Sequence, residues 1–192
     1  MKNNRPYRKS TVPESAELVF EGKIFDVHQW EQKLYDGSFH TFEKIARNDT
    51  AVIYPILPDG KILLIKDSQP QRETVITAPS GRLEEGEYPD AAILRELLEE
   101  TGYKPETLVP FYTIQPYEKI DWVVNVFIGR NCVKVAEPKL DAGEKIELHP
   151  VTFEELLELV ISDSLRQEGL NNLILRALID PQKMQELKKL FF

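Results

Sequence analysis

Alternating apolar and polar residues predict β-strands over much of the chain. Runs rich in β-branched and aromatic side chains, bounded by turn residues, are typical of strands. We expect strands at 18–20, 24–34, 39–46, 51–57, 61–65, 73–78, 108–114, 120–128, 132–135 and 144–148. Asp36-Gly37 lies between two such runs, which indicates a hairpin. Residues 51–57 are almost continuously apolar, as in a strand that is buried on both faces.

A helix is predicted over residues 89–101. Pro89 suits the first turn, and Gly102 suits the position just beyond the last turn. An apolar side of this helix can pack on a sheet. We expect that side to consist of Ala91, Leu94, Leu97 and Leu98.

Further helices are predicted toward the end of the chain. Thr152 and Glu155 have the spacing of a capping box, which opens a helix to about residue 161. Apolar residues recur at helical spacing over 167–179, and Asp180-Pro181 begins a final short helix. Strands mixed with helices in this order indicate an α/β or α+β sandwich.

The 192 residues suit one full domain with a small accessory part. The hydrophobic pattern changes near Asn48-Asp49. We therefore expect a flexible N-terminal arm at 1–15, a small N-terminal β-sheet region at 16–48 and the main domain at 49–192.

The charge and cysteine content narrow the possible functions. The net charge is −8 and the pI is about 5.1, which argues against non-selective nucleic-acid binding. A small phosphorylated substrate is compatible with this negative charge, because a bound divalent metal reverses the local electric field. Cys132 is the one cysteine, and its expected role is a small buried side chain. With no signal-like or membrane-spanning apolar run, we predict a cytoplasmic protein.

Three acidic residues crowd one side of the 89–101 helix. Glu96 faces Glu99 and Glu100 at spacings of three and four residues. Like charges at these spacings destabilise a helix by about 0.2–0.5 kcal/mol per pair, and Arg95 can offset one of them. The simplest interpretation is an acidic helix face that is exposed to solvent. The functional interpretation is a site in which these carboxylate oxygens bind a hard dication.

The stretch from Gly81 to Gly102 resembles the Nudix hydrolase box. The matching positions are Gly81, Glu87, Arg95, Glu96, Leu97, Glu99, Glu100 and Gly102. The resemblance implies a Nudix-type α/β/α sandwich with a mixed β-sheet, and a loop–helix–loop that binds Mg²⁺ or Mn²⁺. It makes Glu96, Glu99, Glu100 and the carbonyl of Ser80 metal ligands, with Arg95 and Glu87 orienting the carboxylates. Water activated by the metal would then attack a diphosphate.

The resemblance is closest to ADP-ribose pyrophosphatases. These relatives use a glutamate in a late loop as the base, and Glu144 is favoured over Glu147 for that role because Gly143 frees the backbone. Arg72 is a candidate phosphate clamp, and Phe25 and Trp30 are candidates for stacking on the base.

The same resemblance implies the reaction and the assembly. It implies cleavage of ADP-ribose to AMP and ribose 5-phosphate, by a homodimer built through the N-terminal sheet. Thr77 stands where these relatives commonly carry a glutamate, so the substrate stays open. The alternatives are GDP-mannose or another nucleoside diphosphate sugar, a dinucleotide, and a non-catalytic nucleotide-binding module of the same fold.

Overall fold

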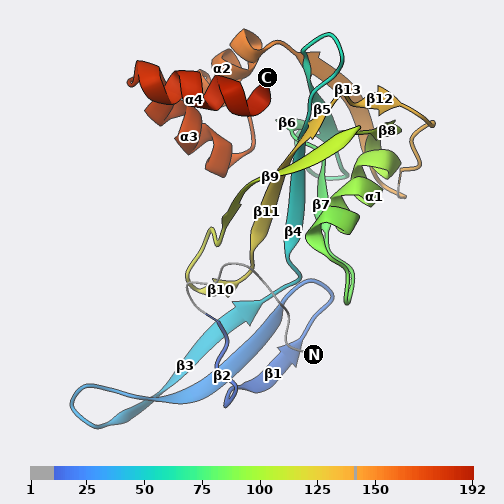
Figure 1. Cartoon of the computed structure of the whole chain (residues 1–192). Helices are drawn as coiled ribbons and strands as arrows, with labels where there is room; N and C mark the ends of the chain where they lie inside the picture. Colours follow the sequence, from blue (N-terminus) through green and yellow to red (C-terminus); the bar gives the residue numbers. More distant parts are fainter. Residues whose placement is uncertain (1–10, 141) are drawn as a thin grey trace. The chain divides into compact units, whose positions relative to one another are not determined.

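The chain forms two compact units in a computed structural model that describes residues 11–140 and 142–192 (Figure 1). The first unit contains the described residues up to Thr50 and the later segment Thr113–Val124. The second contains Ala51–Tyr112 and Asn125–Phe192. Residues 1–10 of the expected arm lie outside the described part. The three regions expected from the sequence stay a prediction. The first unit also contains the later segment Thr113–Val124, which the sequence-based division did not include.

A four-stranded sheet forms the first unit. Its order is β1 (Glu17–Glu21), β2 (Asp26–Lys33), β3 (Phe39–Ala46) and β10 (Ile120–Asp121). The first three strands are antiparallel, so the predicted N-terminal antiparallel sheet is confirmed. Gly37 turns the β2–β3 hairpin with a φ of 88°, a conformation that suits glycine. β10 pairs with β3 as a parallel edge strand, and this pairing was not predicted from the sequence.

The second unit is built on three sheets. Their orders are β7 (Ser80–Arg82)–β4 (Thr50–Pro55)–β11 (Val124–Arg130)–β9 (Thr107–Ile114), β13 (Lys145–Val151)–β5 (Ile62–Ser68)–β6 (Val75–Thr77), and β12 (Val133–Lys134)–β8 (Tyr103–Lys104). The strand predicted at 73–78 corresponds to β6, which ends at Thr77. Ser80 and Gly81 then begin the edge strand β7, and the Pro79 carbonyl accepts a 3.0 Å bond from the Ile53 N–H.

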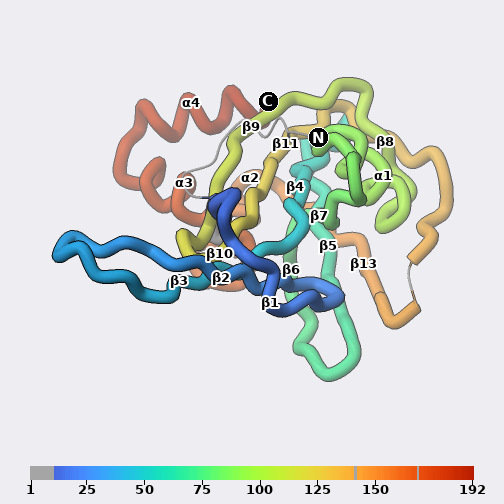
Figure 2. Tube along the Cα trace, turned by 90° about the horizontal axis from the view of Figure 1, so that it is seen from below, coloured from blue at the N-terminus to red at the C-terminus, as the bar shows by residue number. Residues whose placement is uncertain are grey.

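Helices cover the strands of the second unit on two sides (Figure 1 and Figure 2). They are α1 (Pro89–Thr101), α2 (Phe153–Ile161), α3 (Glu168–Leu178) and α4 (Pro181–Phe191). α1 lies on one side, and α2 to α4 lie on the other. The predicted capping box is confirmed, since the Thr152 and Glu155 side chains each accept a bond from the other residue's N–H. α4 is as long as α3 and anchors the buried Phe191 ring.

The structure also describes the single cysteine and the apolar length of the helices. Cys132 is fully buried, as predicted. Within residues 11–140 and 142–192, no helix is both long and apolar enough to cross a membrane.

The buried face of α1 differs from the predicted one. Ala92, Ile93 and Leu97 form its buried side and pack against strands β4 and β11 through a cluster that includes Phe127. Ala91 is exposed, and Leu98 retains 39% exposure. The predicted apolar face was therefore wrong, because it is rotated about the helix axis by about one residue from the face that is buried.

This change of phase moves the acidic residues relative to the core. At about 100° per residue, Glu96 and Glu100 lie between Ala92 and Leu97 around the helix axis, within the buried side. Glu99 points to solvent instead. The helix therefore carries its carboxylates in two different environments.

Candidate active site

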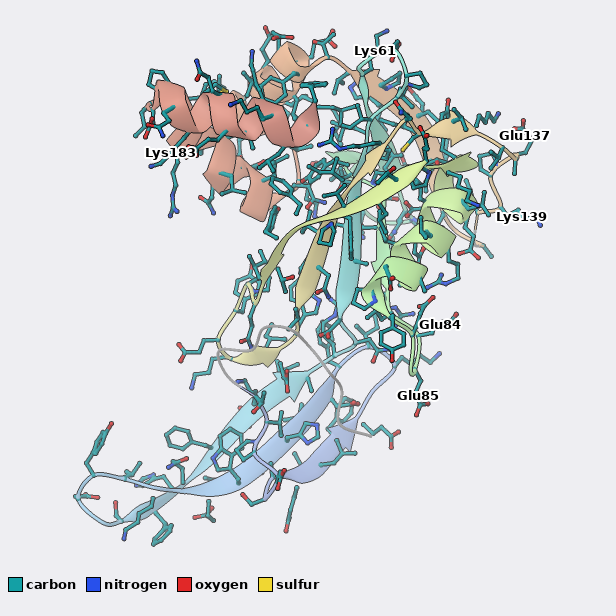
Figure 3. The ribbon with its side chains drawn as sticks, viewed as in Figure 1. Lys61, Glu84, Glu85, Glu137, Lys139 and Lys183 are labelled. Carbon is teal, nitrogen blue, oxygen red and sulfur yellow. The ribbon has the colours of Figure 1, made fainter. Side chains whose placement is uncertain are left out.

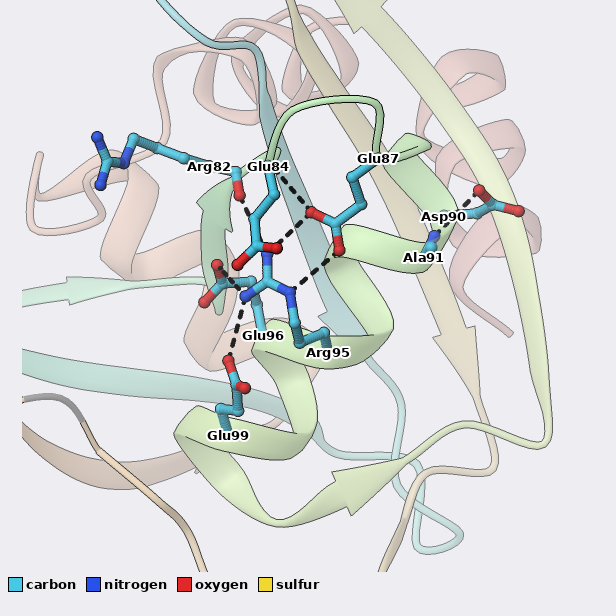
Figure 4. Close-up of polar contacts among 8 residues, drawn as sticks. All are labelled: Arg82, Glu84, Glu87, Asp90, Ala91, Arg95, Glu96 and Glu99. Atoms are coloured by element: carbon cyan, nitrogen blue, oxygen red, sulfur yellow. Dashed lines mark hydrogen bonds and ion pairs between the residues drawn. The ribbon is translucent and has the colours of Figure 1, made fainter. Parts of the chain in front are cut away.

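Arg95 of α1 gathers three carboxylates around one guanidinium (Figure 4). Its Nε and Nη2 donate to the two oxygens of Glu87, each at 3.0 Å. Its Nη1 donates to Glu96 Oε1 at 2.9 Å and to Glu99 Oε2 at 3.1 Å. Nη2 also donates to the main-chain carbonyl of Arg82 at 3.2 Å. The guanidinium therefore ties the box loop to the helix and compensates charge on both.

Glu87 is held from the loop as well as from the helix. Its Oε2 accepts a 2.9 Å bond from the Glu84 N–H. The hydrogen bonds from Arg95 hold the pKa of Glu87 below its ordinary value. The side chains of Glu84 and Glu85, by contrast, are exposed (Figure 3). Of the acids in this loop, Glu87 is therefore the one built into the network.

Glu100 stands in the opposite electrostatic situation. Burial raises its pKa to about 9, and the negative charges of Glu96, Glu144 and Asp67 contribute. The Ser80 N–H donates to Glu100 Oε2 at 3.2 Å and opposes this shift. Burial also raises the pKa of Glu96, although Arg95 stabilises its charge. Negative charge therefore accumulates around Glu100 from three separate elements.

A glycine is needed at position 81 because the backbone there lies close to another side chain, and not because its φ is positive. It does not have a positive φ, unlike Gly86 at 78°. A Cβ built on Gly81 would overlap the carboxyl group of Glu96. A glycine at this position could serve a positive φ or a close approach, and the geometry selects the close approach. Only glycine lets the loop backbone lie directly against the Glu96 carboxylate.

The sheet beside α1 presents Glu144 and Glu147 differently. In the antiparallel register of β13 and β5, Ile146 lies opposite Asp67 and Glu147 lies opposite Lys66. Directly opposed residues share a face, and residues two apart in a strand return to that face. Glu147 is accordingly paired with Lys66 at 2.6 Å. Glu144 precedes Ile146 by two residues, and its charge reaches Glu96 and Glu100.

Asp67 belongs to the acidic surroundings of Glu100 and was missed by the sequence analysis. It lies near the end of β5 and is partly buried. Nothing in its neighbourhood along the chain marks it as functional. The register of β5 with β13 is the signal that would have found it, and that pairing joins segments far apart in the sequence.

The donor set is suited to a hard divalent cation. Glu96, Glu100, Glu144 and Asp67 bring carboxylates toward one region, and carboxylate oxygens are the ligands that Mg²⁺ and Ca²⁺ prefer. Burial is the main cause of the raised pKa of Glu100 and the nearby carboxylates add to it, and a bound cation would favour the ionised form. Among the described residues, no three His, Cys, Asp or Glu side chains stand in a finished metal-binding arrangement. Arg95 draws the Glu96 and Glu99 carboxylates toward itself.

The candidate substrate-binding residues lie in separate places. Arg72 is exposed in the loop after β5, where its Nη1 donates to Gln69 Oε1 at 2.8 Å. Phe25 is 42% exposed in the first unit, with the Arg47 guanidinium 5.5 Å from its ring centroid. Trp30 is partly buried in the same unit. These positions leave the predicted roles untested.

Comparison with known families finds one domain model over most of the chain. The model of the NUDIX domain matches residues 46–168. This range includes the Arg95 network, Glu100 and Glu144.

Three curated proteins show the extent of the similarity. An ADP-ribose pyrophosphatase of Bacillus subtilis (strain 168) is 33% identical over 153 residues, which cover 77% of this chain and 82% of that protein. A methanol dehydrogenase activator of Bacillus methanolicus is 26% identical over 76% of this chain and 80% of its own length. An ADP-sugar pyrophosphatase of Mus musculus is 33% identical over a shorter region, 48% of each chain.

A solved structure shows the same architecture. A crystal structure titled as an ADP compounds hydrolase superposes with a TM-score of 0.70, at 16% identity. The match covers 93% of this chain and 98% of the other. At this identity the similarity concerns the fold, and it confirms the predicted α/β sandwich.

Proposed function

The chain belongs to the NUDIX domain family of hydrolases, and we propose that it cleaves the diphosphate of a nucleoside diphosphate sugar with Mg²⁺. The proposed substrate is ADP-ribose, and the products are AMP and ribose 5-phosphate. The observation that carries the proposal is the 33% identity to an ADP-ribose pyrophosphatase over 77% of this chain. The retained carboxylates of the box support hydrolysis over binding alone.

Four groups are proposed to hold the divalent cation: Glu96, Glu99, Glu100 and the main-chain carbonyl of Ser80. The bond from the Ser80 N–H to Glu100 supports this set, because it brings that backbone next to the carboxylate. When bound, the cation supplies Lewis acidity toward the phosphoryl oxygens. Arg95 and Glu87 orient the carboxylates, which would otherwise repel one another.

Glu144 is proposed as the general base. Its carboxylate accepts the proton of the attacking water, as a positioned carboxylate does in such reactions. Its influence on Glu96 and Glu100 supports this role. The competing candidate, Glu147, is engaged by Lys66 at 2.6 Å on the other face of the strand pair.

Arg72, Phe25 and Trp30 are proposed to bind the substrate. Arg72 would clamp a phosphate oxygen through its guanidinium, and its exposure in the loop after β5 supports this. The two aromatic rings would stack on the base. Variants Arg72→Lys and Phe25→Leu should raise KM more than they lower kcat, because both contacts act mainly in binding.

A substrate panel tests the proposal. The wild-type protein and Glu100→Gln are incubated with ADP-ribose, GDP-mannose or a dinucleotide, with Mg²⁺ or with EDTA. Released nucleoside monophosphate is measured by chromatography. We expect AMP from ADP-ribose with Mg²⁺, and none from the variant or in EDTA. Cleavage of another compound in place of ADP-ribose would reassign the substrate, and binding without any turnover would support the non-catalytic module.

We also propose that the chain is a homodimer that associates through its N-terminal sheet. All residues of β1 are exposed, and they include large apolar side chains at Leu18, Val19 and Phe20. Exposed apolar patches of this kind commonly mark interfaces. Sedimentation of the wild type and of Phe20→Asp should give a dimer and a monomer, and two equal masses would contradict the proposal.

The cytoplasmic location stays a prediction from charge and cysteine content. The single, buried Cys132 supports a reducing compartment, because one cysteine cannot form a disulfide within the chain. Fractionation of the source cells with an antibody to this chain would test it.

A further inference from the structure

We propose that Gln69 is a positioning residue, which holds the guanidinium of Arg72 ready to bind a phosphate group of the substrate. This inference rests on the hydrolase function proposed above, in which Arg72 contacts the substrate. It assigns a role to an amide side chain that lies outside the box. Gln69 bonds to Arg72 through both its backbone and its side chain, within the loop that joins β5 to β6.

Residues 69–72 form a type II β-turn. The Arg72 N–H donates to the Gln69 carbonyl at 3.2 Å, which closes the turn. Pro70 fixes φ at about −65° at the second position, and Gln71 has a φ of 63° at the third. This combination defines the type II turn, in which glycine or asparagine normally occupies the third position. A glutamine with this φ persists only where the surrounding structure enforces it, and such residues cluster at ligand-binding sites.

The Gln69 amide bonds to two charged side chains of opposite sign. Its Oε1 accepts from Arg72 Nη1 at 2.8 Å, and its Nε2 donates to Asp67 Oδ2 at a longer 3.4 Å. An amide offers both an acceptor and a donor, so it can bond to a guanidinium and a carboxylate together. Gln69 is half-buried, whereas Arg72 is exposed. The half-buried amide therefore anchors the exposed guanidinium to the end of β5.

A pair of hydroxyl groups closes the base of the same loop. Ser68 Oγ and Thr74 Oγ1 are 2.7 Å apart and share a hydrogen bond. Asp67 lies opposite Val75 in the antiparallel register, so the hydroxyl pair continues this ladder by one position. The loop is thus fixed by the hydroxyl pair at its base and by the turn at its tip. A loop that is already ordered loses less conformational entropy when it binds a ligand.

The turn lies beside the loop that carries the proposed base. The first residue of β13 is paired with the last residue of β5, so the loop before β13 and the loop after β5 lie at the same end of the two strands. A Cβ built on Gly143 would lie 4.0 Å from Pro70 Cδ, an ordinary van der Waals contact. Gly143 immediately precedes Glu144. The turn that holds Arg72 and the loop of the proposed base are therefore neighbours, as groups that act on one diphosphate need to be.

The orientation of Arg72 before binding has a measurable value. An exposed arginine that rotates freely must be ordered when it binds a phosphate, and the contact with Gln69 removes much of this cost in advance. The ordering of one long side chain corresponds to roughly 3- to 10-fold in affinity. Loss of the Gln69 amide should therefore weaken substrate binding and leave the chemical step unchanged.

A double-mutant cycle on Gln69 and Arg72 tests the proposal. Gln69→Met keeps an unbranched side chain and removes both hydrogen bonds. We expect it to raise the KM for ADP-ribose by about 3- to 10-fold, with kcat within about twofold of the wild type. Arg72→Met should raise KM at least as much, and adding Gln69→Met to it should have no further effect. Additive effects would show that Gln69 does not act through Arg72 and would overturn the proposal.

Gln71→Met is the matched control. It removes an amide from an exposed position of the same turn and keeps an unbranched side chain at the positive φ. Its KM should stay within about twofold of the wild type, as for most surface substitutions. A rise in KM equal to that of Gln69→Met would indicate a general disturbance of the turn, and it would also count against the positioning role.

Nuclear magnetic resonance relaxation of the arginine side chains tests the orientation of Arg72 without substrate. The order parameter of its Nε–H bond should be high in the wild type and should fall below about 0.6 in Gln69→Met, a value that marks flexible groups. An unchanged order parameter would overturn the positioning role, whatever the protein hydrolyses. A wild type that neither binds nor cleaves ADP-ribose would instead overturn the proposed function, and with it the phosphate contact of Arg72, even where the order parameter falls.

Discussion

Two groups of carboxylates on and around α1 differ in how their charge is compensated. Glu87, Glu96 and Glu99 share the guanidinium of Arg95, with contacts between 2.9 and 3.1 Å. Around Glu100 the nearby charges are negative, from Glu96 on the same helix and from Glu144 and Asp67 on the sheet. One side of the helix is therefore neutralised within the chain, and the other is not.

This difference separates two tasks in one site. The Arg95 side fixes the box loop and helix in the cation-free protein and needs nothing further to be stable. On the Glu100 side, burial and the neighbouring carboxylates disfavour the ionised form of Glu100, and a bound cation would stabilise that form. A chain that merely solvated an acidic helix would have no reason to bury Glu100 among further carboxylates.

The largest expected effect comes from Glu100→Gln. The variant should lower kcat by about 10³-fold or more, because cation-dependent stabilisation of the transition state is worth several kcal/mol. Its Tm in EDTA at neutral pH should rise, because the buried carboxyl group, whose pKa is raised to about 9, must take up a proton on folding and an amide need not. Steady-state kinetics and calorimetry check the two effects. Glu85→Gln, an exposed acid of the same loop, is the matched control and should change neither.

Glu144→Gln should follow, with a loss in kcat of roughly 10²-fold or more, the usual contribution of a general base. Cation affinity should change by less than about tenfold, so saturating Mg²⁺ should not restore the rate. Comparison with Glu147→Gln checks the assignment. Should Glu147→Gln be the slower enzyme, the base would lie on the opposite face of the strands.

Arg95→Lys should lower the stability of the protein, whereas Glu100→Gln should raise it. One ammonium group cannot replace the forked contacts to Glu87, Glu96 and Glu99. We expect a lower Tm in EDTA and a 10- to 100-fold weaker cation site, in the range found for groups that orient ligands. A Tm that rises, as predicted for Glu100→Gln, would remove the distinction between the two sides.

The smallest effect is the response of the wild type to Mg²⁺. Saturation at about 100 times Kd should stabilise the protein by about 2.7 kcal/mol. For a chain of this length, that raises Tm by roughly 5–10 °C. Differential scanning fluorimetry with and without EDTA measures the shift. The shift should vanish in Glu100→Gln and persist in Glu85→Gln.

Local chemistry explains why much of the fold could be predicted. The α1 boundaries depend on Pro89 and on Gly102, which has a φ of 76° and closes the helix with a bond to Leu98. The capping box at Thr152 and the turn at Gly37 are equally local. Such signals lie within a few residues of the elements they define, so one sequence is enough to recognise them.

The parts that were missed depend on distant pairings. The apolar residues of α1 fit two helical phases, and only contact with the sheet selects Ala92 and Ile93 for burial. Asp67 becomes part of the site through the register of β5 with β13. The box motif predicts where the site lies, but neither the residues of the sheet near it nor the burial of Glu100 could be predicted from spacing along the chain.

The most direct test locates the cation itself. Crystals grown with MnCl₂ and an uncleavable analogue of ADP-ribose would give an anomalous difference map at the manganese absorption edge. We expect a peak in coordination contact with the carboxylate of Glu100. A map with manganese only elsewhere, and Glu100 away from every peak, would contradict the account.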